Sequence, residues 1–128
     1  MISGYGPQDS WKLEDKLPFF LALEEEISKA ELAGRSTIIG FDANSKLGQK
    51  WIPNDPHEQS QNGHTLAGIM ERHALVVANG TDKCKGVITR RRTTTHGEEI
   101  SAIDFVLLSH DLVKDFVSLE IDEDRKTH

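Results

Sequence analysis

Two sets of residues in this chain have the types and spacing that chemistry requires. Asp104 follows Ser101-Ala102-Ile103 and precedes the apolar run Phe105-Val106-Leu107-Leu108, a pattern typical of a core strand. An ionised carboxylate in such a strand costs several kcal/mol unless a cation or several hydrogen-bond donors meet it. The usual partner of a carboxylate in this position is an imidazole that the carboxylate orients.

The second set is Asp42 and Asn44, which follow the apolar segment Thr37-Ile38-Ile39-Gly40-Phe41. Residues two apart at the end of a strand lie on the same side of the backbone. Such a pair can hold one water, because the Asp accepts a proton or binds a hard metal ion and the Asn supplies a neutral donor and acceptor. Asp and Asn also form turns at strand ends, so the pair gains meaning only in combination with other residues.

The composition describes one globular domain. A chain of 128 residues, 37% hydrophobic and 28% charged, can form one modest core and is not disordered in character. It has no apolar run long enough to span a bilayer, and residues 1–10 have neither the basic nor the apolar part of a secretory signal. Cys84 is the single cysteine, which suits a reducing compartment. We therefore expect an intracellular protein, cytoplasmic or nuclear.

The charge is unevenly distributed along the chain. The net charge of −6 argues against a nucleic-acid partner, and Glu14 to Glu31 alone carries −4. Thr81 to Gly97, in contrast, holds five basic residues and one acidic residue, a net +4. This basic segment either contacts phosphate or is a solvated loop. Its basic residues are Lys83, Lys85, Arg90, Arg91 and Arg92.

Periodicity predicts the elements that must position these residues. One helix starts around Asp15 and Pro18 and ends at Ala33-Gly34, and a second is capped by Asn62 and continues to His73. The region 43–61 has no sustained period and reads as a long loop that tends to carry function. The strands are expected at 1–5, 36–41, 75–78, 87–95, 102–109 and 116–121. The sequence thus predicts an α/β fold with a mixed β-sheet and flanking helices.

The polar motifs occur in a specific order. Tyr5-Gly6-Pro7-Gln8 comes first, followed by Asp42-x-Asn44, Asn62-Gly63, Asn79-Gly80, Thr89-Arg90 and Ser101-x-x-Asp104-Phe105. This order resembles the endonuclease/exonuclease/phosphatase superfamily, which includes DNase I-like and exonuclease III-like enzymes. Its details are most similar to the endonuclease domains of non-LTR retrotransposons. The resemblance implies that residues 1–128 are a single partial domain, the carboxy-terminal half of a DNase I-like four-layer α/β sandwich.

The resemblance also implies a chemistry, the Mg²⁺-dependent hydrolysis of DNA phosphodiesters, with Mn²⁺ as a possible substitute. Asp42 would activate or orient the attacking water and is the possible metal ligand. Asn44 would hold the water and the phosphate, and Asp104 would orient a catalytic His. Substrate contacts would come from Tyr5, Gln8, Thr89 and Arg90.

Departures from the superfamily pattern limit this expectation. The usual Gly-Asp-Phe-Asn is replaced here by Gly40-Phe41-Asp42-Ala43-Asn44, which we align on Asp-x-Asn. The Asn and the metal-binding Glu that precede the Tyr element in the superfamily have no counterpart, and the Ser-Asp-His element would follow His128. We therefore expect weak or absent metal binding and no competent nuclease activity from this chain alone.

The histidines offer no convincing substitute for the missing catalytic imidazole. His128 is terminal, and His96 is separated from Asp104 by a turn containing Gly97. His57, His64 and Asp55 match no metal-ligand spacing, so we expect them to be solvated loop residues. His73, on an apolar helix face, is expected to be a satisfied core histidine.

A half domain would leave one face of its sheet uncovered. We expect that face to carry Ile103, Phe105 and Leu107, with Leu75 and Val77, and to form a homodimer. DNA is the expected substrate and a membrane is not an expected partner. Two alternatives stay open: a non-catalytic remnant that acts in self-association or nucleic-acid binding, and a phosphatase or lipid phosphodiesterase of the same superfamily.

Overall fold

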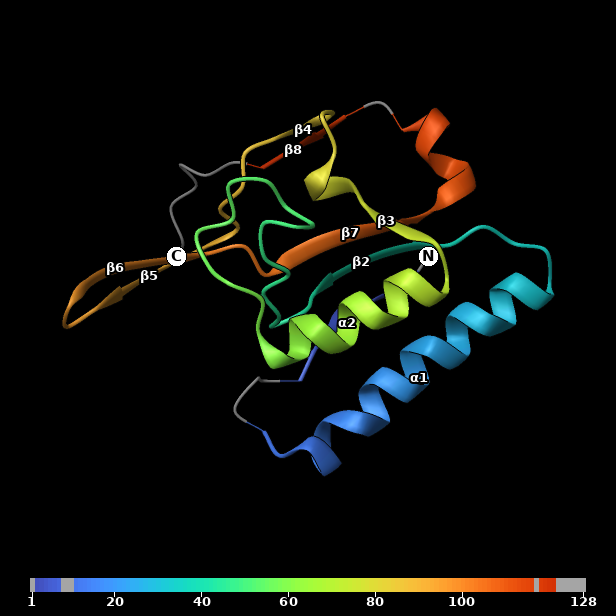
Figure 1. The fold of residues 1–128 in the computed structure, drawn as a ribbon, viewed down its shortest axis with the longest axis horizontal. Coiled ribbons are helices and arrows are strands. Elements are labelled where there is room, and N and C mark those ends of the chain that lie inside the picture. The colour runs from blue at the N-terminus through green and yellow to red at the C-terminus, as the bar shows by residue number, and fades with distance from the viewer. Residues whose placement is uncertain (1, 8–10, 117, 122–128) are drawn as a thin grey trace.

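The sheet of this protein is mixed, as its sequence predicts. The computed structural model describes residues 2–7, 11–116 and 118–121. Four strands form the main sheet in the order β1-β2-β7-β3, with β1 and β2 parallel and the other pairs antiparallel. These strands are β1 (Ile2–Tyr5), β2 (Ile38–Asp42), β3 (Leu75–Val77) and β7 (Asp104–Ser109). Helices α1 (Leu13–Leu32) and α2 (Gln61–Arg72) lie side by side on the sheet (Figure 1).

The hydrophobic core lies between the two helices and one face of the sheet. Each helix contributes an apolar face at helical spacing, and each strand contributes alternate residues. The helical part of this core consists of Phe20, Leu23 and Ile27 from α1 and Leu66, Ile69 and Met70 from α2. The strand part consists of Ile39, Phe41, Leu75, Val77, Phe105 and Leu107.

The sheet face that the sequence predicts to be exposed is buried by this packing. Phe105 and Leu107 are buried in the core, as are Leu75 and Val77, and Ile103 is buried too. Because successive strand residues point to opposite faces, the other face is the one that carries Ile38, Val76 and Val106. Ile38 is 41% exposed, and the two valines are half-buried. The wrong face was expected because β7 is apolar on both sides.

Two short ribbons flank the main sheet. Strands β4 (Cys84–Lys85) and β8 (Leu119–Glu120) pair in parallel, whereas β5 (Arg90–Thr94) and β6 (Gly97–Ser101) form an antiparallel hairpin. This hairpin projects from one end of the molecule (Figure 1). The expected strands 87–95 and 116–121 are thus each shorter than predicted, and β4 and β6 were not foreseen. Short 3-10 turns occupy Ala78–Gly80 and His110–Asp115.

The starts of the helices differ slightly from expectation. Helix α1 begins at Leu13, and Lys12 provides no side-chain cap. Helix α2 is capped by Ser60 rather than Asn62, since the Ser60 hydroxyl accepts a hydrogen bond from the Gly63 N–H at 3.1 Å. Asn62 is fully buried instead. Among the described residues, no helix is long and apolar enough to cross a membrane.

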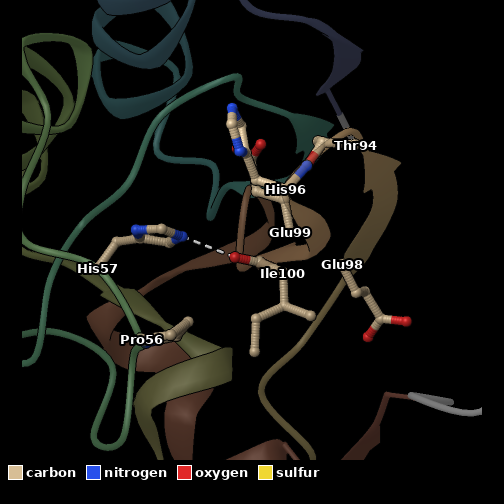
Figure 2. Close-up of a pocket in the computed structure, with 7 residues that line it drawn as sticks. All are labelled: Pro56, His57, Thr94, His96, Glu98, Glu99 and Ile100. Atoms are coloured by element: carbon tan, nitrogen blue, oxygen red, sulfur yellow. Dashed lines mark hydrogen bonds between the residues drawn. The ribbon is translucent and has the colours of Figure 1, made fainter.

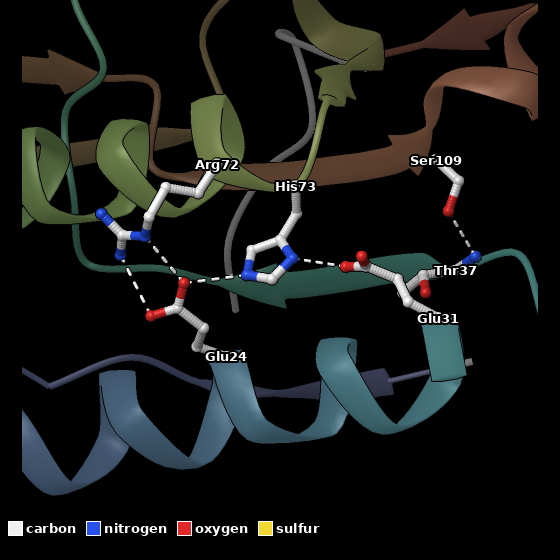
Figure 3. Close-up of polar contacts among 6 residues, drawn as sticks. All are labelled: Glu24, Glu31, Thr37, Arg72, His73 and Ser109. Carbon is white, nitrogen blue, oxygen red and sulfur yellow. Dashed lines mark hydrogen bonds and ion pairs between the residues drawn. The ribbon is translucent and has the colours of Figure 1, made fainter. Parts of the chain in front are cut away.

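A cluster of charged side chains joins the two helices (Figure 3). Arg72 donates to both carboxylate oxygens of Glu24, at 2.8 and 3.0 Å. His73 lies between Glu24, 2.8 Å away, and Glu31. His73 is thus a satisfied histidine as expected, with both ring nitrogens bonded to carboxylates, but it lies at the half-buried rim of the helix pair rather than in the core. The hydrogen bond from Arg72, with a smaller contribution from His73, lowers the pKa of Glu24 to about 2.

Candidate active site

Three strands bring the predicted site residues to one edge of the sheet. Asp42 is the last residue of β2, and its Cα is paired with that of Asp104, the first residue of β7. On the other side of β2, Asp42 is paired with Tyr5 of the parallel strand β1. Asp104 therefore lies half-buried at the start of its strand rather than inside it. The sheet assembles Tyr5, Asp42 and Asp104 from three distant parts of the sequence.

The two carboxylates share the sheet face opposite the helices. Residues directly opposite each other in an antiparallel pair have side chains on the same face with Cβ atoms about 4.5–5.5 Å apart. Like charges in this relation destabilise a sheet. Two carboxylates this close are tolerated where a cation or hydrogen-bond donors stabilise them. A metal site, or a phosphate site that works through a metal ion, contains such a cation. The register of β2 and β7 therefore makes this edge chemically unusual.

The turn after β2 is locked by its own polar groups. The Asp42 carboxylate accepts a hydrogen bond from the Asn44 N–H at 3.1 Å, and Asn44 has a positive φ of 45°. The Asn44 Nδ2 donates to the Gly6 carbonyl at 2.8 Å, and the Gly6 N–H donates to the Asp42 carbonyl at 2.6 Å. A Cβ on Gly6 would lie 2.3 Å from the Ala43 carbonyl oxygen. One donor of Asn44 thus orients the turn instead of facing a ligand.

Thr89 lies beside Asp104 but contacts its backbone. The Thr89 hydroxyl oxygen accepts hydrogen bonds from the N–H groups of Ile103 and Asp104, at 2.9 and 3.1 Å. The next residue, Arg90, is exposed at the base of the hairpin. Thr89 is therefore near the site, with its oxygen already engaged.

Two of the expected residues fall beyond what can be described. Gln8 and His128 lie outside the described residues. For Tyr5 the backbone is placed in β1, beside Asp42.

Two asparagines missed as site residues hold the site's backbone. Asn79 donates to the Asp104 carbonyl at 3.0 Å and accepts from the Val106 N–H at 3.0 Å. Asn62 donates to the carbonyl of Pro7 at 2.7 Å and to that of Asn44 at 3.4 Å. Both are the first residue of an Asn-Gly motif, which was the only sequence signal for them.

The loop between β2 and α2 is packed rather than solvated. Asp55 is 2% exposed, and its carboxylate accepts from the His57 N–H at 2.9 Å and the Gly48 N–H at 3.3 Å. The His57 Nε2 lies 2.6 Å from the Ile100 carbonyl, to which it must donate. The expectation of solvated residues is thus wrong for Asp55 and His57, whereas His64 is exposed.

A pocket opens where this loop meets the β5–β6 hairpin (Figure 2). His57, His96 and Glu99 are among the residues that line it. Within the described part of the chain, no group of three or more His, Cys, Asp or Glu side chains is arranged to hold a metal ion. The pocket is therefore not a preformed metal centre.

The charge of the basic segment is partly offset by neighbouring carboxylates. Arg91 pairs with Glu98 at 2.7 Å and Arg92 with Glu99 at 2.8 Å across the hairpin. Hydrogen bonding to Arg92 lowers the pKa of Glu99. Lys83 donates to the Phe116 carbonyl at 2.6 Å. Arg91 and Arg92 are thus paired with carboxylates, whereas the Lys83 contact leaves the lysine charge in place.

Comparisons with known proteins agree with this fold. No protein-family profile matches the chain, and no curated protein matches it. A solved structure does match: the endonuclease domain of TRAS1, a telomere-specific non-LTR retrotransposon, with a TM-score of 0.59 and 22% sequence identity. The match covers 87% of this chain and 45% of the TRAS1 chain. This chain therefore has an endonuclease-like α/β fold that spans less than half of the structure to which it is similar.

Proposed function

We propose that this chain supplies part of the active site of a metal-dependent DNA endonuclease. The observation that carries the proposal is the pairing of Asp42 with Asp104 at the sheet edge where Asn44 and Tyr5 also lie. The similarity to a retrotransposon endonuclease domain supports it. In this proposal Asp42 orients or activates the water and Asp104 orients an imidazole from outside the described residues.

The donors at this edge fit a hard divalent cation. Mg²⁺ is usually bound through one or two carboxylates, with water and substrate phosphates completing its octahedral shell. Asp42 would hold it, and Asp104 lies on the neighbouring strand. When bound, the ion would neutralise charge on the phosphate and the leaving oxygen. With so few protein ligands, we expect binding by this chain alone to be weak, so that it is detected only by titration to high ion concentrations.

DNA is the substrate that we propose. The β5–β6 hairpin starts next to Asp104 and projects from the molecule, with Arg90 exposed at its base. Lys85 on the neighbouring ribbon is also exposed. Basic groups beside paired carboxylates suit an extended polyanion, although a phosphatase or lipid phosphodiesterase would use the same hydrolytic groups.

Nicking of supercoiled plasmid in Mg²⁺ tests this function. The chain is assayed alone and as a fusion in which it replaces the matched 45% of the TRAS1 endonuclease domain. The unmatched remainder of that domain is then present to supply the Glu and Ser-Asp-His elements that the resemblance calls for. We expect no nicking by the chain alone and Mg²⁺-dependent nicking by the fusion, with p-nitrophenyl phosphate and phosphatidylinositol phosphates left intact. The same fusion carrying Asp42→Ala is the matched control.

Either of two results would count against the proposal. A folded fusion that nicks equally well with Asp42→Ala would show that the activity does not come from this site. Hydrolysis of the phospholipid in preference to DNA would show that the alternative, a lipid phosphodiesterase, is correct. Robust nicking by the unfused chain, lost in Asp42→Ala, would support the site but contradict the expected incompetence.

Self-association is the second candidate function, and the open sheet face favours it. Ile38, Val76 and Val106 lie on the face that the helices do not cover. A second copy packed face to face would bury these residues, as sheets do in a sandwich. We propose a homodimer through this face in place of the face expected from the sequence.

Sedimentation at micromolar concentration tests the dimer. The chain should sediment as a dimer, and Ile38→Lys should convert it to a folded monomer because a charge would then lie in the apolar interface. Ile38 is already exposed, so the substitution should leave the monomer's stability nearly unchanged. A well-folded monomeric wild type would reject the dimer.

A further inference from the structure

The Asn79 side chain of the Asn79-Gly80 motif makes hydrogen bonds to β7 beyond the point where the neighbouring strand β3 ends. Strand β3 ends at Val77, which is paired with Leu107, so the part of β7 from Val106 back to Asp104 extends beyond it. The Asn79 side chain takes over there: its Nδ2 donates to the Asp104 carbonyl and its Oδ1 accepts from the Val106 N–H, both at 3.0 Å. One carboxamide thus makes the pair of bonds that a neighbouring strand would make.

The Asn62 side chain of the Asn62-Gly63 motif likewise bonds to the backbone, here next to the carboxylate of Asp42. Asn62 is 1% exposed, and its Nδ2 donates to Pro7, just after β1, and to the Asn44 carbonyl. It therefore joins the end of β1 to the turn that begins at Asp42. Because Asn44 also bonds to Gly6, the turn is held from both sides.

The glycine of each motif lets the backbone of the loop between β2 and α2 pack closely against it. A Cβ on Gly63 would lie 1.9 Å from the Lys46 carbonyl oxygen, and a Cβ on Gly80 would lie 1.9 Å from the Trp51 carbonyl oxygen. Any other residue at these positions would push the loop away. The asparagine and the glycine of each motif thus act together on the backbone around the site.

We propose that Asn62 and Asn79 are positioning residues of the candidate active site. They act through the backbone of Asn44 and of Asp104, and so fix where the carboxylates of Asp42 and Asp104 lie relative to each other. This inference rests on the proposed function, since it assigns a role toward a divalent cation at that site. Groups that orient metal ligands commonly change metal affinity by about 10- to 100-fold when removed.

Mn²⁺ titration of the isotope-labelled chain, followed by paramagnetic broadening of its amide signals, tests the inference. The variants are Asn79→Ala and Asn62→Ala. The control is Ile27→Val, which trims a buried side chain of α1 that contacts the core and not the sheet edge. We expect each asparagine variant to need about tenfold more Mn²⁺ than wild type for equal broadening around Asp42 and Asp104. The control should need the same amount as wild type.

The outcomes separate this inference from the proposed function. Wild type without broadening at the site would reject the function, and the inference with it. Wild-type broadening that both asparagine variants retain within twofold would reject the inference alone. If Asn79→Ala does not fold, Asn62→Ala decides, because it leaves the Asn79 bonds to β7 intact. Faster hydrogen exchange of the Val106 amide in Asn79→Ala would independently verify the lost bond.

Discussion

At the scale of single residues, polar side chains in this protein bond mainly to backbone near the site. Thr89, expected to contact substrate, accepts from two consecutive N–H groups. Thr89→Val removes that acceptor and should cost about 1–3 kcal/mol of stability, because partly buried donors lose their partner. Thr89→Ser keeps the hydroxyl and should be close to wild type in urea unfolding and in DNA affinity. Loss of DNA affinity in a folded Thr89→Val that Thr89→Ser recovers, at a urea concentration far below both unfolding midpoints, would restore the substrate-contact role.

Two glycines of helix α2 provide a matched pair. Gly→Ala inside a helix normally stabilises by about 1 kcal/mol. Gly68→Ala should do so, since its new Cβ would meet only the flexible Arg72 side chain at 3.3 Å. Gly63→Ala should instead destabilise by about 1–3 kcal/mol, because the Lys46 carbonyl must move. Thermal unfolding of both variants checks this difference, and stabilisation by Gly63→Ala would contradict the close approach.

The sequence predicts which residues lie together better than it predicts what they touch. Asp42, Asn44 and Asp104 were identified by their order and neighbours, and the sheet does bring them to one edge. Their register could not be deduced, since it depends on pairing between segments some sixty residues apart. The sequence predicts Asn62 as the cap of α2, whereas Ser60 caps it, because either residue type can cap a helix and only the packing of the loop decides.

At the scale of elements, the Glu24 cluster couples the two helices in a pH-dependent way. The pKa of Glu24 is lowered from 4.5 to about 2, chiefly by Arg72. A lowered pKa stabilises the fold above pH 4.5, and that contribution disappears as the pH falls toward 2. Arg72→Met should therefore lose a small part of its stability at pH 7, since solvent screens a largely exposed pair, and should match wild type near pH 2.

Urea unfolding at several pH values measures this difference. Lys50→Met, which removes another exposed cation paired with Glu71, is the control and should leave the titration of Glu24 unchanged. A constant difference between Arg72→Met and wild type from pH 7 to pH 2 would show that the cluster is not electrostatic in origin.

The acidic residues of the β5–β6 hairpin determine how much of its positive charge is left unpaired to attract DNA. Glu98→Gln together with Glu99→Gln releases Arg91 and Arg92. DNA binding should then tighten, and its dependence on the logarithm of salt concentration should steepen by about one to two. Glu25→Gln with Glu26→Gln on α1 makes the same charge change away from the hairpin and serves as the control. Equal tightening in both double variants would indicate a non-local charge effect.

Periodicity identified the long elements and failed for the short ones. The helices and β2 follow from apolar residues at helical spacing and in a buried run. Strand β6, Gly-Glu-Glu-Ile-Ser, carries little apolar signal and is specified by its pairing with β5. Strands β4 and β8 have two residues each and form only where their partners meet.

At the scale of the whole molecule, the fold class was predictable because helical and strand patterns interleave. The open face was not, since β7 is apolar on both faces, with Phe105 and Leu107 toward the helices and Val106 and the buried Leu108 away from them. The open face carries both the apolar residues of the proposed dimer and the two carboxylates. The proposed dimer would therefore cover the same face that carries the proposed site.

The most direct measurement of the proposed site is the location of bound Mn²⁺ in the wild-type chain. Amide signals around Asp42, Asn44 and Asp104 should broaden first, excess Mg²⁺ should reverse the effect, and Asp42→Asn should abolish it. The acidic surface of α1, with Glu24 to Glu26, is the competing location. Broadening that begins there and is unchanged by Asp42→Asn would contradict a divalent-cation site at the paired carboxylates.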